Sequence, residues 1–220
     1  MEILLDSKTK EKGLIVGHMI ITDLINKKNR NGKMERIIKD LETDVKQNPD
    51  KYLKKMEIDA YEKLSEQKSA IKSSHTAARI LLNIIINQGK LPTISRIVDC
   101  MNIVSVKTGL TISIWNMDKL EGKITYKMSE GNEKYWPFMG DEVELEKDEL
   151  ATFNEEKVLG LVRYRDSKYA PVTLETKNIL IHIQGVNGIT KESVQNAMDE
   201  LQTLIIENIG GNLQEKTVHH

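Results

Sequence analysis

The pattern of apolar and polar residues predicts a strand followed by helices in the first 90 positions. Residues 14–24 (LIVGHMIITDL) are dense in β-branched side chains, which is typical of a buried strand. Residues 33–47 carry apolar side chains at spacings of three and four, which place them on one face of a helix. The sequence Asn48-Pro49-Asp50 ends this helix, because the residue before a proline is disfavoured in the helical region.

Two further helices are predicted before position 90. The first covers residues 51–65, with Tyr52, Met56 and Tyr61 as its inward positions. The second covers residues 74–87 and is so apolar in its second half that we expect it to be buried on most sides. A glycine at position 89 is suited to end it.

The second half of the chain changes from helical to β-like patterning. An amphipathic stretch at 94–106 ends at Gly109, and a last helix begins at Thr190 and closes at Gly210-Gly211. Between them lie short β-like runs separated by turn-forming Gly and Asn residues, at 111–115, 123–128, 142–145, 150–153, 158–164 and 178–184. Helices packed on a sheet, with most strands in the second half, indicate an α+β fold.

Local punctuation suggests how the chain is organised. The segment Lys90-Leu91-Pro92-Thr93 is the best internal breakpoint. We expect residues 1–90 to supply an N-terminal strand and helices to the same module, residues 91–211 to form a β-rich core with the C-terminal helix, and residues 212–220 to form a tail.

Composition limits the partners. The chain of 220 residues has 32 Lys+Arg and 33 Asp+Glu, so it is not a polybasic protein that binds nucleic acid through overall charge. The average conceals a basic segment at 27–39, with a net charge of plus five, and an acidic segment at 141–156, with a net charge of minus seven. The basic segment predicts either a local binding patch or simply a polar turn leading into a helix.

Several classes of site are disfavoured. A lone cysteine, Cys100, excludes an intrachain disulfide and lies in an apolar stretch, so we expect a buried, inert thiol. The N-terminal residues lack a signal-peptide pattern, and no apolar run approaches the ~20 residues that cross a bilayer, so we predict a cytoplasmic protein without membrane contact. Motifs for nucleotide binding or hydrolysis are absent, and the three internal histidines (18, 75 and 182) are far apart, so we expect no cofactor and no metal.

Two places carry possible chemistry. If 158–164 is a strand, Arg163 and Arg165 point to one side and Tyr164 to the other, an arrangement able to hold phosphate and stack on a base. The alternative is a solvent-facing edge whose arginines pair with the acidic segment. His182 alternates with apolar residues, which is typical of a sheet histidine but also compatible with a pocket wall.

Several motifs in order resemble a known family. They are Asp99-Cys100-Met101-Asn102-Ile103-Val104, then Gly109-Leu110-Thr111, then the run from Trp115 through Asp118-Lys119-Leu120 to Ile124, the turn Gly131-Asn132-Glu133, and finally Arg165-Asp166-Ser167 with 171–178. Together they resemble the tRNA-binding B3/4 domain in the β subunit of phenylalanyl-tRNA synthetase. The core of the match covers roughly 89–211, and the order of elements resembles free-standing members of the family over nearly the whole chain.

This resemblance implies a compact α+β module with a mixed sheet. In the synthetase the module contains an editing site that hydrolyses tyrosine wrongly attached to the phenylalanine tRNA, a reaction that needs a pocket and a held water rather than a protein nucleophile. We therefore expect a protein that binds the acceptor end of tRNA and hydrolyses mischarged aminoacyl-tRNA in trans. The alternative is a non-catalytic module of the same fold that binds an amino-acid-like ligand or another protein. Synthesis of aminoacyl-tRNA by this chain alone is not expected.

The resemblance also implies site residues. Asn102 keeps the family's asparagine, and Ser113 stands where the synthetases carry a histidine. Gly160 survives from a glycine-rich loop, in which Arg163 and Tyr164 replace small residues. His182 falls near the acidic residue that recognises the tyrosine hydroxyl, so it would not preserve the same selectivity. We expect Asn102, Ser113 and His182 to line a pocket and the arginines at 163 and 165 to contact phosphate or the terminal nucleotide.

Overall fold

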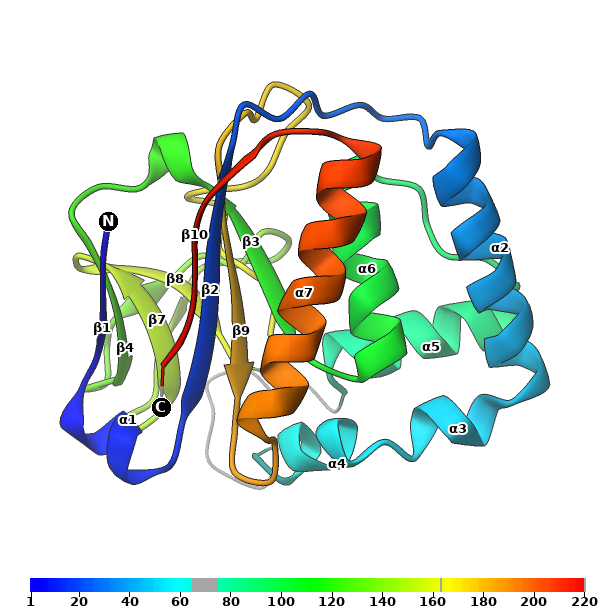
Figure 1. The fold of residues 1–220 in the computed structure, drawn as a ribbon. Coiled ribbons are helices and arrows are strands. Elements are labelled where there is room, and N and C mark those ends of the chain that lie inside the picture. Colours follow the sequence, from blue (N-terminus) through cyan, green and yellow to red (C-terminus); the bar gives the residue numbers. More distant parts are fainter. Residues whose placement is uncertain (65–74, 163, 220) are drawn as a thin grey trace.

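The chain folds into three layers: a first sheet, a second sheet and a layer of helices (Figure 1). The computed structural model describes residues 1–64, 75–162 and 164–219. The strand order is β1-β4-β7-β8 in the first sheet and β10-β2-β9-β3 in the second. The second sheet is the middle layer, so its two faces contact different surroundings.

The first sheet is mixed. Its strand β1 runs parallel to β4, whereas β4, β7 and β8 are antiparallel neighbours. The strands span Glu2–Leu5 (β1), Lys123–Met128 (β4), Leu150–Asn154 (β7) and Lys157–Leu161 (β8). A two-stranded ribbon of β5 (Lys134–Tyr135) and β6 (Val143–Glu144) lies between β4 and β7 in the chain. A parallel pair within an otherwise antiparallel sheet confirms the predicted mixed α+β fold.

The second sheet is antiparallel throughout and contains strands from both ends of the chain. It consists of β10 (Asn212–His219), β2 (Ile15–Thr22), β9 (Ile179–Gly185) and β3 (Ile112–Asn116). Strands β2 and β9 are central and buried along nearly their whole length, which explains their dense β-branched composition. The segment expected to be a tail forms the edge strand β10, and its mostly polar, exposed side chains gave no strand signal.

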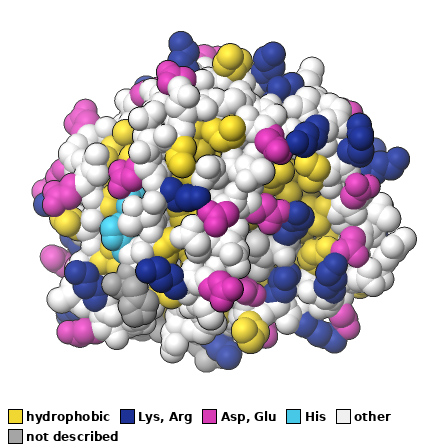
Figure 2. All heavy atoms as spheres, viewed as in Figure 1, with side chains coloured by type: hydrophobic (Ala, Val, Ile, Leu, Met, Phe, Trp, Pro, Cys, Tyr) yellow, Lys and Arg dark blue, Asp and Glu magenta, His cyan; other side chains and the backbone are white. Residues whose placement is uncertain are grey.

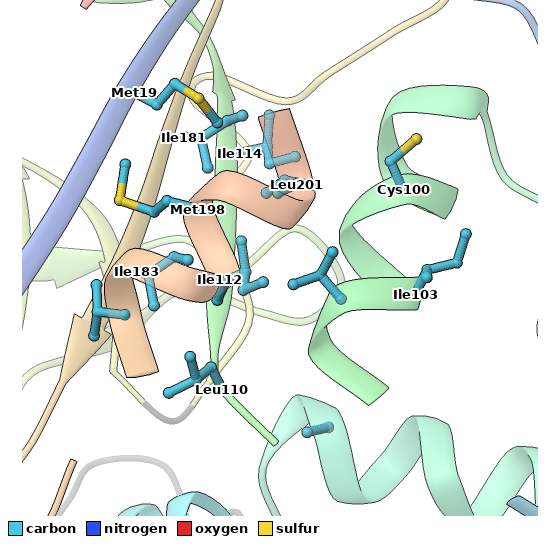
Figure 3. Close-up of a cluster of buried hydrophobic side chains, with 14 of the residues drawn as sticks. Met19, Cys100, Ile103, Leu110, Ile112, Ile114, Ile181, Ile183, Met198 and Leu201 are labelled. Atoms are coloured by element: carbon cyan, nitrogen blue, oxygen red, sulfur yellow. The ribbon is translucent and has the colours of Figure 1, made fainter. Parts of the chain in front are cut away.

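Most of the helices lie on the face of the second sheet that points away from the first sheet, whereas the short first helix lies against β4 (Figure 1). The longer ones are α2 (Gly32–Gln47), α5 (Ala77–Gln88), α6 (Arg96–Thr108) and α7 (Lys191–Asn208); the shorter ones are α1 (Ser7–Glu11), α3 (Pro49–Leu53), α4 (Met56–Lys63) and the 3₁₀ turn η2 (Met117–Lys119). Figure 3 shows Met198 and Leu201 of α7 lying against Ile181 and Ile183 of β9. The C-cap glycines Gly89 and Gly109 have positive φ, as their predicted role requires.

Two helix predictions need correction. The helix expected over residues 51–65 is two helices, because Lys55 adopts an extended conformation between α3 and α4. Met56 consequently points outward and is 69% exposed. The helix α5 is not buried on most sides either, since Ile80 is 45% exposed and only one stripe of the helix packs on its neighbours. No helix among the described residues has the length and apolar content of a membrane span.

Candidate functional site between the two sheets

The strand β9 presents chemically different side chains to its two neighbouring layers. Ile179, Ile181 and Ile183 alternate with Leu180, His182 and Gln184. Ile181 and Ile183 contact the helical layer (Figure 3). The second group, which includes the polar residues His182 and Gln184, faces the first sheet. There the Gln184 amide donates a hydrogen bond to the Thr152 hydroxyl of β7 (2.8 Å). Polar side chains therefore occupy the space between the two sheets.

Aromatic rings fix the centre of this space. The ring of His182 stacks on Trp115 of β3, with 4.2 Å between ring centroids, and lies 5.5 Å from the ring of Tyr126 on β4. Ser113 is the direct cross-strand neighbour of His182. Strands from both sheets thus contribute to one group of side chains.

This group has an excess of unpaired polar atoms. In the described part of the chain six buried side-chain polar atoms lack a hydrogen-bond partner, and four of them gather here: Trp115 Nε1, Tyr126 Oη, Asp166 Oδ1 and His182 Nδ1. Native proteins leave few such groups unpaired, because each costs about 1–3 kcal/mol. We call Ser113, Trp115, Tyr126, Asp166 and His182 the polar cluster. Unpaired buried donors and acceptors gathered in one place call for an explanation, and they make the polar cluster the candidate site.

Asp166 enters the polar cluster from the segment after β8. It forms a β-bridge with Gly160, and the missing side chain of that glycine leaves room for the carboxylate. Burial raises the pKa of Asp166 to about 7, although the Ser113 hydroxyl, the Trp115 indole and the Ile114 backbone each oppose the increase. At neutral pH this carboxyl is therefore protonated in some molecules and ionised in others. A group that accepts and donates protons near pH 7 needs a pKa in this range.

His182 has the opposite shift. Burial, with a smaller contribution from His18, lowers its pKa to about 3. The imidazole is consequently neutral at physiological pH and offers one nitrogen as an acceptor and the other as a donor.

The structure brings some of the predicted site residues together and separates others. Ser113 and His182 lie in the polar cluster, and Gly160 lies directly beside it. Asn102 is buried in α6, within the helical layer on the other side of the second sheet. It therefore does not share a pocket wall with Ser113 and His182.

The predicted arginine strand is wrong in part, because β8 ends at Leu161 and Tyr164 lies in a bend beyond it. Arg163 lies outside the described residues. Arg165 is exposed, donates to the backbone carbonyl of Met139 (3.3 Å) and lies over the ring of Tyr164. Within the described ranges no acidic side chain forms an ion pair with Arg165, so the alternative of pairing with the acidic segment is not seen for this residue.

The basic segment 27–39 is partly structural. Arg30 donates to the buried Asp99 carboxylate (2.6 Å) and to the carbonyl of Pro92, while Lys33 pairs with Glu207. On the face drawn in Figure 2, Lys and Arg side chains alternate with Asp and Glu rather than forming a patch of one sign.

Sequence reasoning missed three members of the polar cluster: Trp115, Tyr126 and Asp166. Trp115 and Asp166 lie within motifs used for the resemblance, but their pattern gave no chemical role. The available signal for Trp115 was its alternation with Ser113, which places both on the face of β3 that carries no isoleucine.

The B3/4 domain family model matches residues 65–210 of the 220. The chain belongs to the B3/4 domain family. The match includes β3, β4, β7, β8 and β9, and hence every residue of the polar cluster. The polar cluster therefore lies wholly within the family-matched part of this chain, and the strands β1, β2 and β10 lie outside that part.

Relatives of this B3/4 domain protein are phenylalanine–tRNA ligase β subunits. The one from Vibrio parahaemolyticus is 26% identical over 144 residues, which are 55% of this chain and 18% of that subunit. The one from Bifidobacterium longum is 30% identical over 104 residues, covering 44% of this chain and 12% of the subunit. The chain thus spans less than a fifth of the length of these relatives.

A solved structure has the same fold over the whole chain. It is an N-terminal fragment of the phenylalanyl-tRNA synthetase β subunit from Pyrococcus horikoshii, with a TM-score of 0.55 and 15% identity, covering 100% of this chain and 54% of that fragment. This coverage extends the likeness from the family-matched region to the N-terminal strands and to β10.

Proposed function

We propose that this protein binds the aminoacyl end of a charged tRNA and hydrolyses the ester that joins a wrongly attached amino acid to it. The observation that carries the proposal is Asp166, a partly buried residue whose carboxyl has a shielded Oδ1 atom and a pKa near 7 and lies among unpaired polar atoms. Membership of the B3/4 family and relatives named as phenylalanine–tRNA ligase subunits direct the choice of substrate toward aminoacyl-tRNA.

Ester hydrolysis assigns a role to each group of the polar cluster. The Asp166 carboxylate takes a proton from a water molecule whose oxygen bonds to the ester carbonyl carbon. The carbon–oxygen bond to the ribose then breaks, and the proton passes from Asp166 to the ribose oxygen. The Trp115 N–H and the Tyr126 O–H are donors for the carbonyl oxygen as its negative charge develops.

Access and selectivity follow from the same residues. Ser113 and Asp166 are only partly buried, so an amino acid enters from their side of the polar cluster. Neutral His182, stacked on Trp115, then lies at the far wall and can pair with a polar group on the amino acid side chain. A hydroxylated side chain suits such a wall better than a purely apolar one.

A test uses a panel of aminoacyl-tRNAs. Purified protein is incubated with tyrosyl-tRNA, phenylalanyl-tRNA and other charged tRNAs, and the loss of each ester is followed over time. Accelerated hydrolysis of at least one ester is expected, with a rate that rises with pH through about 7 as Asp166 loses its proton. If no ester is lost faster than without protein, the hydrolytic proposal is wrong.

Two aspartate variants sharpen this test. Asp166→Asn removes the base and is expected to slow hydrolysis by about 10²–10⁴-fold while tRNA binding persists. Asp141→Asn removes an exposed carboxylate from the neighbouring loop and is expected to leave the rate unchanged. Equal effects of the two substitutions would argue against a specific role for Asp166.

One observation favours a second candidate, a non-catalytic binder of an amino-acid-like ligand. The four unpaired polar atoms are shielded from solvent, as in sites that enclose a small molecule. A thermal-shift screen against free amino acids and nucleosides distinguishes the two. A ligand that raises the melting temperature in the absence of ester hydrolysis would establish the binder instead.

A further inference from the structure

The segment that carries Asp166 also pairs with the chain before β6. The Phe138 amide donates to the Asp166 carbonyl (2.8 Å) and the Lys168 amide donates to the Trp136 carbonyl (2.9 Å). A β-bridge between Pro137 and Ser167 fixes the register of this antiparallel pair. Residues opposite each other in such a pair point to the same side, so Trp136, Phe138 and Lys168 share the side of Asp166.

Aromatic rings and lysines gather on this short ladder. The rings of Trp136 and Tyr169 meet edge to face at 6.3 Å. The Lys168 ammonium lies 4.1 Å from the centroid of Trp136, and the Lys157 ammonium lies 5.5 Å from that of Tyr169. We call Trp136, Phe138, Lys157, Lys168 and Tyr169 the aromatic–lysine face.

The aromatic–lysine face is open to solvent. Phe138 is 58% exposed, and both lysines are exposed. Glu142 follows Phe138 by four residues in the chain, and its carboxylate is paired with Lys134 (3.2 Å), which reduces its repulsion of an incoming anion.

We propose that the aromatic–lysine face binds the single-stranded nucleotides next to the aminoacyl ester, with bases stacked on Trp136 and Phe138 and phosphates held by Lys157 and Lys168. This inference rests on the proposed function, because it presumes an RNA end whose ester reaches Asp166.

Stacking explains why the partner is single-stranded RNA rather than a duplex. Aromatic side chains stack on unpaired bases, whereas the bases of a helix are already stacked on each other. The flexible lysines that cover the rings lose little when a base displaces them, because an exposed cation–π contact contributes only about 0.5–1 kcal/mol. Each displaced ammonium then lies beside the phosphate that arrives with the base.

The ladder also connects this face to the polar cluster. Phe138 lies directly opposite Asp166 in this ladder, so a base stacked on Phe138 lies beside the residue that carries the carboxyl. The terminal ribose, which carries the ester, can therefore reach Asp166 while the preceding bases remain on the aromatic–lysine face.

The experiment uses an uncharged oligonucleotide. A fluorescently labelled single-stranded RNA ending in CCA is titrated with the protein at low salt and followed by anisotropy, beside the same sequence in a fully paired duplex. We expect the single strand to bind more tightly than the duplex and its affinity to fall as salt is added. Phe138→Ala and Lys168→Ala are each expected to weaken binding, by about 5- to 100-fold for the aromatic change.

Matched controls exist elsewhere in the chain. Lys51 also lies over a tyrosine ring, that of Tyr52, but belongs to α3, so Lys51→Ala is expected to leave RNA binding unchanged. Ile80→Ala removes an exposed apolar side chain from α5 and serves as the control for Phe138→Ala. The chain has two tryptophans, so in a Trp115→Phe variant quenching by the oligonucleotide reports on Trp136 alone.

The outcomes separate this inference from the proposed function. Oligonucleotide binding requires no ester, so RNA binding that depends on Phe138 and Lys168 without ester hydrolysis would contradict only the hydrolytic function. Hydrolysis that is unaffected by Phe138→Ala and Lys168→Ala would overturn the aromatic–lysine face alone. A dimer that dissociates on Phe138→Ala, with no RNA binding, would show that a second copy of the chain occupies this face.

Discussion

The two faces of the second sheet differ although the same strands form both. Toward the helices, β3 and β9 present isoleucines that interlock with Met198 and Leu201 (Figure 3). Toward the first sheet, the same strands present Ser113, Trp115 and His182 and leave polar atoms unpaired. Alternation along a strand thus separates two roles by a single residue step.

The helix-facing side of the second sheet stabilises the fold, whereas the side toward the first sheet lowers its stability. Burying an apolar side chain of this size contributes about 1.5–3 kcal/mol, and the helix-facing side consists of such residues. Each unpaired polar atom on the opposite side costs about 1–3 kcal/mol. A protein under selection for stability alone would replace these polar residues with apolar ones, and the proposed function gives a reason for keeping them.

The largest expected effect comes from the helix-facing side. Ile181→Ala is expected to lower the free energy of unfolding by about 2–5 kcal/mol, because it removes a fully buried side chain that packs against α7. Urea denaturation measures the loss. Below the melting temperature, ester hydrolysis per folded molecule is expected to persist, since the substitution does not touch the polar cluster. A loss below about 1 kcal/mol would show that this face does not provide the main packing.

The sequence predicted the helix-facing side better than the polar side. Apolar alternation and β-branched density located β2, β4 and β9 within one or two residues, because burial on a regular strand leaves a period in the sequence. Strands β1 and β10 were missed, since an exposed edge strand is specified by its partner rather than by its own composition.

The candidate site could be predicted only in part. Ser113, Gly160 and His182 came from the resemblance, which compares aligned positions. Asp166 could not be recognised, because its burial depends on a bridge to Gly160 and on contact with β3, both of which arise from tertiary folding. Asn102 is the opposite case. It matches a motif position of the family, but the fold places it in the helical layer, away from the polar cluster.

An intermediate effect is expected from Asp166, and it depends on pH. The folded-state pKa of about 7 lies above the ordinary value near 3.9, so the folded state holds the proton more tightly. Stability is therefore unaffected below about pH 4, falls as pH rises from about 4 to 7, and is constant above that range. Asp166→Asn removes this loss and is expected to stabilise the protein at pH 8 by about 2–4 kcal/mol, but not at pH 4.

Denaturation curves at both pH values measure this difference, with Asp141→Asn as the control for removal of one exposed charge. A stabilised but inactive Asp166→Asn protein would extend the comparison, because it would show directly that the polar face sacrifices stability for chemistry. Parallel pH curves for the wild type and the Asp166→Asn variant would contradict the raised pKa.

The smallest effect on stability is expected from Gly160→Ala, and it tests the polar face without changing any of its polar groups. A Cβ at this position would lie 3.1 Å from Asp166 Oδ1 and 4.0 Å from the Trp115 ring, so the carboxylate must move by a few tenths of an ångström. We expect a stability change below about 1 kcal/mol and a fall in kcat/KM for ester hydrolysis of about tenfold or more, because small displacements of a base greatly reduce its effectiveness. Gly32→Ala is the matched control, since a Cβ there meets no atom within 4 Å. If Gly160→Ala instead lowers stability as much as Ile181→Ala and leaves kcat/KM unchanged, the face between the sheets serves only for packing, as the helix-facing side does. That result would contradict the distinction between the two faces.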